Sequence, residues 1–139
     1  MHTFEDAKLI LDKFGISSSS VEIWGTGNPK REFLWSEDMA DACVFLMENV
    51  NFKDLIYDNK EVKYTHINIG TGQEITIREL AETIKKCIGF EGKLVFNTQK
   101  PDGTMRKVTD VSKLHKLNWK HKMDVTEGIQ ELYKWYLNT

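Results

Sequence analysis

Short strand-like segments and amphipathic helical segments alternate along this chain of 139 residues. The most complete helical signal begins at Thr76, which forms a capping-box pattern with Glu79, and it stops at Gly89. Between these ends the apolar residues recur at helical spacing, namely Ile77, Leu80, Ala81, Ile84, Cys87 and Ile88. Helices of this kind between short strands, with no internal repeat, predict an α/β fold.

Four further helices are predicted from similar signals. The first carries Phe4, Ala7, Leu11 and Phe14 at helical spacing and stops at Gly15. The others are a helix from Met39 to Val50 with Ser36 as its N-cap, a short helix from Asp110 to Leu117, and a last helix after Asp124, which forms a capping box with Glu127. Five helices are thus expected.

Runs rich in β-branched and aromatic residues predict short strands. They are Val21 to Trp24, Glu32 to Trp35, Tyr64 to Ile69, Lys93 to Phe96 and Met105 to Thr109. The stretch from Asn51 to Lys63 has no period and is expected to be a loop or insertion. Tyr64 to Ile69 enters a Gly-x-Gly turn followed by a helix, as an inner strand of a parallel sheet does. Such a strand needs neighbours, and an edge left unpaired favours self-association with a second copy.

The composition excludes several classes of protein. A length of 139 residues fits one domain or a piece of something larger, and a formal net charge of −2 gives no electrostatic footprint for nucleic acid. The chain has no apolar run of about eighteen residues, and its start, MHTFEDAKLI, is unlike a signal peptide. We therefore expect a cytoplasmic protein without a membrane segment. Cys43 and Cys87 lie on helical stripes without metal-ligand spacing, so we expect buried, reduced thiols and no metal site.

The stretch VEIWGTGNPKREFLW combines a permissive backbone turn with an aromatic ring and an arginine. Gly25 and Gly27 let the backbone approach a ligand closely, and Arg31 provides planar donors suited to phosphate oxygens. This combination favours a diphosphate as the ligand. The alternative is a hairpin loop in which Arg31 pairs with a carboxylate and Trp24 belongs to the core. The loop is not the dinucleotide motif G-x-G-x-x-G, because Lys30 stands where the third glycine belongs.

A second polar cluster follows in KPDGTMRK. Asp102 lies on a turn and is suited to accept both hydroxyls of a ribose, while Arg106 and Lys107 are suited to reach phosphate or base oxygens. The alternative is a solvated turn closed by an Asx hydrogen bond. Neither cluster contains a nucleophile with a base, and the later turn Gly70-x-Gly72 also departs from the dinucleotide motif.

Four motifs occur in order along the chain, WGTGNPKREF, SEDMADACVFLME, HINIGTGQEITIRELAETI and KPDGTMRKVTDVSKLHKLNW. They resemble the carboxyl-terminal part of the GDP-L-fucose synthase family. These are extended short-chain dehydrogenases that act as NADPH-dependent GDP-4-keto-6-deoxy-D-mannose 3,5-epimerase/4-reductases. The resemblance runs from about Val21 to Leu137. It implies that residues 1–139 form one GDP-sugar-binding region, with the last strand and helices of a Rossmann sheet and a small mixed α/β subdomain, without the amino-terminal NADP-binding domain.

The resemblance also implies roles for individual residues. Trp24 and Arg31 match the family's substrate-binding tryptophan and arginine, and Asp102 and Lys107 match its later nucleotide-sugar contacts. By this analogy Arg31 neutralises the diphosphate, Trp24 packs beside it, and Asp102 with Lys107 holds the nucleoside end. The family has a further substrate arginine upstream, but no arginine precedes Arg31 in this chain.

The family's catalytic groups have no counterpart in this sequence. In the family, NADP(H) binds a Gly-rich Rossmann segment, reduction uses a Tyr-x-x-x-Lys pair, and epimerisation uses a cysteine and a histidine. No tyrosine here is followed by a lysine four residues later, and Cys43 and Cys87 lie on helical stripes. The resemblance therefore implies a chain that binds a GDP-sugar, contains no catalytic residue, binds no cofactor and is inactive alone.

Two alternatives remain open. The chain could be part of another nucleotide-sugar epimerase or dehydratase, which would share Arg31 but prefer UDP or dTDP. It could also be a non-catalytic binding or assembly module with a vestigial pocket. A preference for GDP over UDP would exclude the first alternative, and nucleotide binding of any kind would exclude the second.

Overall fold

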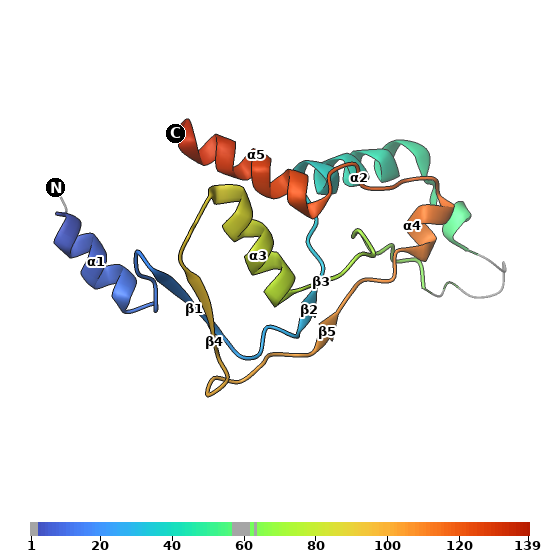
Figure 1. Ribbon diagram of the computed structural model, residues 1–139. Helices are drawn as coiled ribbons and strands as arrows, with labels where there is room; N and C mark the ends of the chain where they lie inside the picture. The colour runs from blue at the N-terminus through green and yellow to red at the C-terminus, as the bar shows by residue number, and fades with distance from the viewer. Residues whose placement is uncertain (1–2, 57–61, 63) are drawn as a thin grey trace. The chain divides into compact units, whose positions relative to one another are not determined.

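The computed structural model describes residues 3–56, 62 and 64–139, which form a mixed α/β structure and confirm the predicted class (Figure 1). Its elements are α1 (Phe4–Asp12), β1 (Ser20–Trp24), β2 (Lys30–Arg31), α2 (Ser36–Asn49), the 3₁₀ helix η1 (Phe52–Leu55), β3 (Ile75–Thr76), α3 (Ile77–Ile88), β4 (Lys93–Asn97), β5 (Arg106–Lys107), α4 (Ser112–Lys116) and α5 (Val125–Leu137). The chain divides into two compact units. Unit 1 comprises Met1–Arg31, Ile75–Lys107 and Tyr133–Thr139, and unit 2 comprises Glu32–Glu74 and Val108–Leu132.

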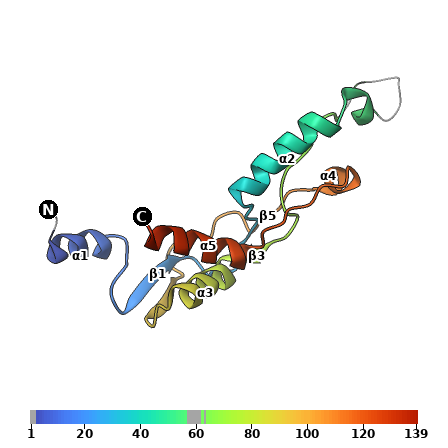
Figure 2. The ribbon, with the colours of Figure 1, turned by 90° about the horizontal axis from the view of Figure 1, so that it is seen from above.

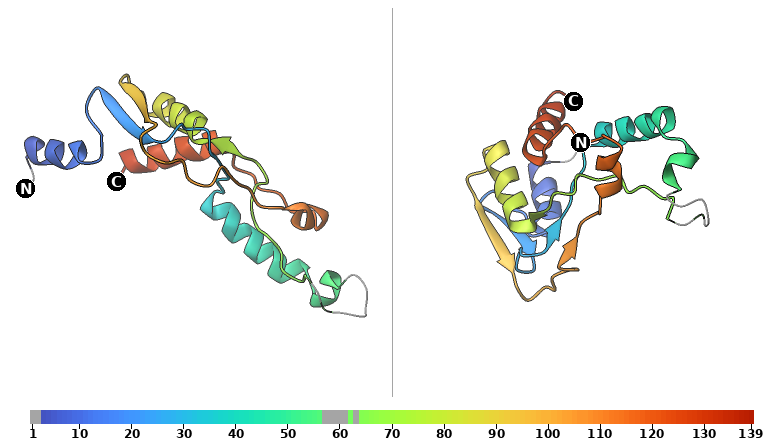
Figure 3. Two further views of the ribbon diagram at one scale, coloured as in Figure 1. Left: turned by 90° about the horizontal axis from the view of Figure 1, so that it is seen from below. Right: turned by 90° about the vertical axis from the view of Figure 1, so that its right-hand side faces the viewer.

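The strands of the described residues all belong to unit 1, where they form two small sheets. β1 and β4 lie side by side as a parallel pair, with α3 alongside (Figures 1 and 3). The register places Val21 opposite Leu94 and Ile23 opposite Phe96, so these apolar side chains share one face of the pair. In the second sheet β2 lies between β3, to which it is antiparallel, and β5, to which it is parallel. This sheet therefore brings together the chain that follows β1 and the chain that follows β4.

The helix predicted after Thr76 has the expected ends. The Thr76 hydroxyl accepts a hydrogen bond from the Glu79 amide at 3.1 Å, and the Thr76 amide donates to the Glu79 carboxylate at 2.9 Å. At the other end Gly89 has a left-handed φ of 69°. The capping box and the terminal glycine thus define α3 as the sequence predicted.

The two helices predicted near the end of the chain are also present. The Asp110 carboxylate accepts a hydrogen bond from the Ser112 amide, where α4 begins. Ahead of α5 the Asp124 carboxylate accepts from the amides of Thr126 and Glu127, and the Glu127 carboxylate accepts from the Asp124 amide. Acidic side chains therefore satisfy one free amide at the start of α4 and two at the start of α5.

The apolar core of the described residues lies in unit 2. Ala42 and Leu114 are fully buried there, and Trp119 is 4% exposed. The half-buried residues that pack against them are Leu34, Phe45, Leu46, Ile67 and Ile69. α2 and α4 thus meet over a small cluster that a segment preceding β3 completes.

Two carboxylates of α2 anchor the loop that precedes α5. Asp41 accepts a hydrogen bond from the Trp119 indole N–H at 2.8 Å. Asp38, which is 4% exposed, accepts from the amides of Lys122 and Met123 at 3.1 and 3.0 Å. The polar face of α2 therefore contributes to the packing of unit 2 as its apolar face does.

The predicted strand from Tyr64 to Ile69 is not a strand in the structure. Its burial still alternates, with Ile67 packed against the core and His66 exposed, and the segment passes between α2 and α4 (Figure 2). The Lys113 ammonium donates to the carbonyls of Tyr64 and His66, and no described strand pairs with the segment. The prediction was wrong because a strand requires a hydrogen-bonded neighbour, which side-chain alternation does not supply.

The predicted strand from Glu32 to Trp35 is also wrong, because the strand, β2, lies earlier, at Lys30–Arg31. The backbone of Trp35 instead forms the N-cap of α2, one residue before the predicted cap at Ser36. The Met105 to Thr109 strand is likewise reduced to the two residues of β5. The aromatic and β-branched residues in these stretches favour strands by their intrinsic propensity. The local connections of the chain override that propensity here.

Two other predicted boundaries change. α1 ends at Asp12 rather than Phe14, because the Phe14 amide donates to the Leu11 carbonyl three residues back and so closes a turn. The predicted loop from Asn51 to Lys63 contains η1, and its residues 57–61 and 63 lie outside the described residues.

The prediction that both cysteines are buried is wrong. Cys43 is exposed and Cys87 is half-buried. Cys43 lies one turn from both Met39 and Met47, which are 41% and 85% exposed, whereas Ala42 on the neighbouring face of α2 is fully buried. The apolar stripe of α2 is thus wider than the face that the core covers.

Candidate functional site

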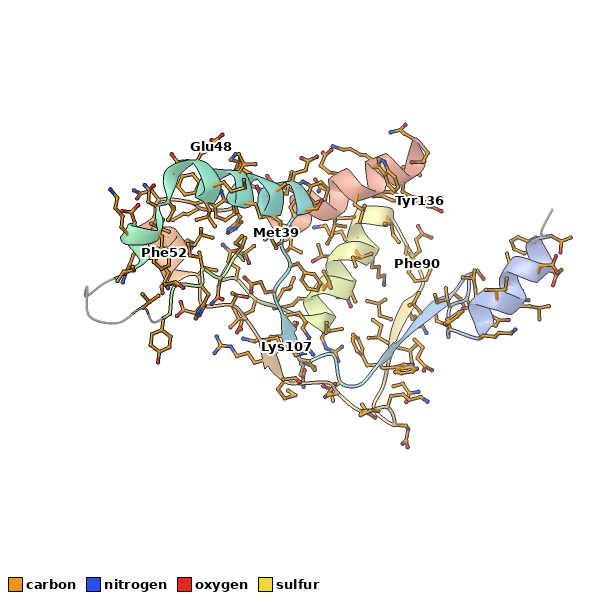
Figure 4. All side chains as sticks on the ribbon, turned by 180° about the vertical axis from the view of Figure 1, so that it is seen from behind. Met39, Glu48, Phe52, Phe90, Lys107 and Tyr136 are labelled. Carbon is orange, nitrogen blue, oxygen red and sulfur yellow. The ribbon has the colours of Figure 1, made fainter. Side chains whose placement is uncertain are left out.

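The two polar clusters predicted from the sequence meet on the sheet of β3, β2 and β5 in unit 1. The parallel register places Arg31 of β2 opposite Lys107 of β5, and Lys30 opposite Arg106. Paired residues of neighbouring strands share a face, and successive residues alternate between the faces. Arg31 and Lys107 therefore lie together on one face of the sheet, and Figure 4 shows Lys107 on its strand.

Two backbone carbonyls orient the guanidinium of Arg31. Its Nη1 group donates to the carbonyl of Lys30 at 2.6 Å and to the carbonyl of Thr104 at 2.7 Å. A Cβ placed on Gly103 would lie 3.1 Å from the Nη2 atom, so the turn packs closely against the guanidinium. The hydrogen bonds of Arg31 thus go to backbone carbonyls, one in its own strand and one directly after the KPDG turn, and not to the carboxylate that the hairpin alternative required.

Asp102 joins the same turn to the loop after β1. Its Oδ1 atom accepts from the Thr26 amide at 2.8 Å, and its Oδ2 atom accepts from the Thr26 hydroxyl at 2.7 Å. Each carboxylate oxygen retains a further lone pair after these bonds. Arg31 and Asp102, which the sequence predicted to converge on one ligand, are therefore both tied to the turn at residues 102–104.

Trp24 is not part of the core that the hairpin alternative required. It ends β1 and is 66% exposed. The Lys100 ammonium lies 5.1 Å from the centroid of a Trp24 ring, within cation–π distance. Trp24 thus offers an aromatic surface at the start of the loop that leads to Arg31.

Arg78, in the first turn of α3, is a further contact of this loop that sequence reasoning missed. Its Nη2 group donates to the Thr26 carbonyl at 2.7 Å, and its amide donates to the Gly27 carbonyl at 2.9 Å. Its guanidinium lies 3.6 Å from the centroid of the Phe96 ring. Because 52 residues separate Arg78 from Thr26, no local pattern could have indicated the contact.

Glu32 was missed as well, and it holds the second Gly-x-Gly turn, which belongs to unit 2. Its Oε1 atom accepts from the amides of Thr71 and Gly72, both at 2.6 Å, and its Oε2 atom accepts from the Thr109 amide at 2.7 Å. Burial alone would raise the pKa of Glu32, but hydrogen bonds from Thr109, Gly72 and Thr71 outweigh burial and lower the pKa below its ordinary value. The fold therefore favours the ionised carboxylate.

Carboxylates of the chain accept hydrogen bonds from amides in both Gly-x-Gly turns. Phosphate binding at such turns uses backbone N–H groups that point at the ligand. In the first turn the Thr26 amide donates to Asp102, and in the second the amides of Thr71 and Gly72 donate to Glu32. The amides of Thr26, Thr71 and Gly72 are therefore already engaged by carboxylates of the chain.

Neither a metal site nor a membrane-spanning helix is found in the part of the chain that the structure describes. No group of three or more His, Cys, Asp and Glu side chains there is placed to hold a metal ion. Among the same residues, no helix has both the length and the apolar character needed to cross a membrane. The candidate site of unit 1 thus consists of Trp24, Arg31, Asp102 and Lys107, with Arg78 against its loop.

Comparisons with known proteins identify relatives of the chain. Residues 6–70 match the NAD dependent epimerase/dehydratase family. The chain is 47% identical over 137 residues to GDP-L-fucose synthase 1 of Arabidopsis thaliana, a match that covers 99% of this chain and 37% of that protein. It is 44% identical over 121 residues to GDP-L-fucose synthase of Escherichia coli (strain K12), which covers 87% of this chain and 37% of that protein.

The structure also resembles the crystal structure of a GDP-6-OMe-4-keto-L-xylo-heptose reductase from C. jejuni. The TM-score is 0.92 and the sequence identity is 52%, over 99% of this chain and 39% of that one. The chain thus spans well under half of the length of each of these proteins. Sequence and structure together show that the chain is related to part of the GDP-L-fucose synthases, and its residues 6–70 match the NAD dependent epimerase/dehydratase family.

Proposed function

We propose that this chain binds the diphosphate of a GDP-sugar and forms the GDP-sugar-binding portion of a relative of GDP-L-fucose synthase, an NADPH-dependent 3,5-epimerase/4-reductase. The observation that carries the proposal is the cross-strand pair of Arg31 and Lys107. Like charges directly opposite each other on neighbouring strands repel. A diphosphate bound between them replaces this repulsion with charge-assisted hydrogen bonds.

The hydrogen bonds of Arg31 support a bidentate contact with phosphate. Its Nη1 group donates to two carbonyls, which leaves the Nε–H and Nη2–H groups for a pair of phosphate oxygens. Sequence reasoning assigned Lys107 to the nucleoside end, but its position opposite Arg31 favours the diphosphate. Trp24 would pack beside the nucleotide. The predicted contact between Asp102 and the ribose stays a prediction, and it would use the lone pairs that Thr26 leaves.

Calorimetric titration of the full chain with GDP and with UDP tests the proposal. We expect GDP to bind more tightly than UDP, and Arg31→Ala to weaken GDP binding by about tenfold or more, because a hydrogen bond to a charged group is lost. Arg106→Ala is the matched control, since Arg106 lies on the other face of the sheet. A preference for UDP would indicate a different nucleotide-sugar enzyme, and no binding at millimolar concentration would indicate a module with a vestigial pocket.

A GDP-heptose is a second candidate for the bound sugar nucleotide. The C. jejuni heptose reductase is 52% identical to this chain, compared with 47% for GDP-L-fucose synthase 1 of A. thaliana. Both candidates share the diphosphate and the guanosine and differ in the sugar. Titration with GDP-L-fucose and with a GDP-heptose distinguishes them, because tighter binding of the heptose would assign the chain to heptose metabolism.

We also propose that the chain alone binds no NADP(H) and does not catalyse. The support is that Asp102 and Glu32 engage the amides of both Gly-x-Gly turns, and that the sequence has no Tyr-x-x-x-Lys pair. The epimerase and reductase steps would then depend on residues outside this chain. A fluorescence titration of NADPH with the chain tests this, and a saturable change in emission would contradict it.

Self-association through an unpaired strand edge remains part of the proposal. The segment from Tyr64 to Ile69 has the alternation of a strand but no ladder partner among the described residues. A strand from a second copy could pair with it. Light scattering should then show a mass that rises with concentration, and a monodisperse monomer would refute the idea. The cytoplasmic location inferred from the sequence stays a prediction.

A further inference from the structure

Thr26 lies in the loop between β1 and β2, and other residues bind each of its polar groups. Its amide and hydroxyl donate to Asp102 at 2.8 and 2.7 Å, and its carbonyl accepts from Arg78 at 2.7 Å. Its hydroxyl also accepts from the Asn28 amide at 3.1 Å. A half-buried threonine bonded in this way is held in one backbone conformation and one rotamer.

The glycines on either side of Thr26 allow the loop to adopt this arrangement. Gly25 and Gly27 have φ values of 82° and 78°, in the left-handed region where other residues are strained. A Cβ on Gly25 would collide with the Asp102 carboxylate, and a Cβ on Gly27 would collide with the Phe96 ring. The backbone of the loop therefore packs directly on these two side chains.

Contacts other than its hydrogen bond to Thr26 also fix the position of Arg78. Its backbone is part of α3, and its amide donates to the Gly27 carbonyl at 2.9 Å. Its guanidinium stacks on Phe96, 3.6 Å from the ring centroid. The donor to the Thr26 carbonyl is thus rigid at both the backbone and the side chain, as a residue that positions a binding loop needs to be.

We propose that Asp102 and Arg78 are positioning residues, which clamp Thr26 and thereby hold Trp24 and Arg31 in the arrangement that binds a GDP-sugar. The inference rests on the proposed function. It gives Asp102 a role through Thr26 rather than through a contact with the ribose, and it adds Arg78 to the site. The Thr26 clamp, formed by Asp102, Thr26 and Arg78, acts on the loop that connects the aromatic ring to the guanidinium.

Amide hydrogen exchange of the ligand-free chain tests the Thr26 clamp directly. Asp102→Ala and Arg78→Met should each speed exchange of the Thr26 amide by about tenfold or more, because each removes a hydrogen bond that keeps the loop closed. Methionine keeps an apolar side chain over Phe96 but has no donor. Glu82→Gln, at an exposed position of α3, is the control and should leave this amide unchanged. Unchanged exchange in both clamp variants would overturn the inference.

A double-mutant cycle then separates positioning from direct contact, with calorimetric binding of GDP and of inorganic pyrophosphate as the measurement. Thr26→Val and Asp102→Ala should each weaken the binding of GDP and of pyrophosphate by the same factor, about tenfold. The double variant should bind no more weakly than Asp102→Ala, because Asp102→Ala already removes the hydroxyl bond that Thr26→Val removes. Thr26→Ser, which keeps the hydroxyl, should retain binding. A loss confined to GDP, or losses that add, would show direct contact between Asp102 and the ribose and would overturn the inference.

The two experiments distinguish failure of the inference from failure of the proposed function. If the wild-type chain binds neither GDP nor pyrophosphate, the proposed function falls and the positioning role falls with it, whatever the exchange rates show. If both ligands bind and the clamp variants bind as the wild type does, only the positioning role falls. Circular dichroism melting of each variant identifies any that fails to fold. If Asp102→Ala is one of these, Thr26→Val still reports on the bond between the Thr26 hydroxyl and Asp102.

Discussion

At the scale of the residue, single carboxylates hold the loops of this protein in place. Glu32, Asp38 and Asp102 each accept two or more hydrogen bonds from groups distant in the sequence. Hydrogen bonds to a carboxylate are stronger than those between neutral groups. An amide left without its acceptor in a partly buried site costs about 1–3 kcal/mol. Removal of one such carboxylate should therefore be measurable in the free energy of unfolding.

Replacement of Glu32 by glutamine should lower the free energy of unfolding by about 1.5–3 kcal/mol near neutral pH. Because the pKa of Glu32 is lowered in the fold, its contribution is present above the pKa of the unfolded chain, about 4.3, and is lost as pH falls through the lower folded-state pKa. Urea unfolding should thus separate Glu32→Gln from the wild type at neutral pH and less so at about pH 3. Glu48→Gln, exposed on α2, is the control, and an equal loss at both pH values would contradict the prediction.

Replacement of Asp38 by alanine should destabilise the chain by about 2–3 kcal/mol, because the amides of Lys122 and Met123 lose a buried acceptor. Glu37→Ala is the matched control, since it removes a neighbouring charge from the same first turn of α2 and should cost under about 1 kcal/mol through the helix dipole. Thermal melting of both variants measures the difference. Equal shifts in Tm would mean that the charge, and not the two hydrogen bonds, stabilises the helix start.

At the scale of the element, local residues determine where a helix begins and ends, whereas a short strand depends on a partner elsewhere in the chain. Thr76 and Gly89 delimit α3 through bonds and backbone angles that belong to the helix itself. β2 and β5 contain only two residues each, so their existence depends on the partner strand. A helix end can therefore be altered and measured in isolation from the rest of the fold.

Replacement of Gly89 by alanine should cost about 1 kcal/mol, because the left-handed backbone places a Cβ close to the following carbonyl. No atom lies within 4 Å of a Cβ built at this position, so packing contributes nothing to the cost. Gly89→Asn should cost less, since asparagine tolerates the left-handed region. Urea unfolding of both variants is the measurement, and an asparagine variant as unstable as the alanine variant would point to another cause.

At the scale of the whole molecule, burial is unevenly distributed. The buried apolar side chains of the described residues, Ala42, Val111, Leu114 and Trp119, all belong to unit 2. α1, in unit 1, has no buried residue. The large apolar side chains of Phe4 and Leu9 in this helix, and of Phe14 just after it, are exposed. A segment with few buried contacts opens at low free energy.

Hydrogen exchange of the whole chain should therefore be faster in α1 than in α2. The amides of α2 around Ala42 lie over the core, whereas those of α1 are held by the helix alone. A helix of nine residues is marginal in water without packing, so we expect a difference of about tenfold or more. Mass spectrometry of peptides from both helices measures it. Equal protection would indicate that α1 is covered in solution, as self-association would produce.

Only part of the candidate site could be predicted from patterns of residues in the sequence. Gly25, Gly27 and Arg31 could be selected from the sequence, because glycine and arginine have conformational and donor properties that few residues share. Their meeting with the KPDG turn depends on the register of β2 with β5, which no local pattern encodes. Arg78 and Glu32 were missed for the same reason, since a common charged residue gives no signal of a partner more than thirty residues away.

By itself the sequence determined the α/β class, the helix ends at Thr76, Gly89 and Asp124, and the residue types available to a phosphate, because these depend on neighbours along the chain. Only the tertiary structure decided which stretches are strands, since a ladder needs a second segment, and Tyr64 to Ile69 has none among the described residues. It also decided that Arg31 faces Lys107 and that Asp102 binds Thr26, because hydrogen bonds across 76 residues form only when the chain has closed.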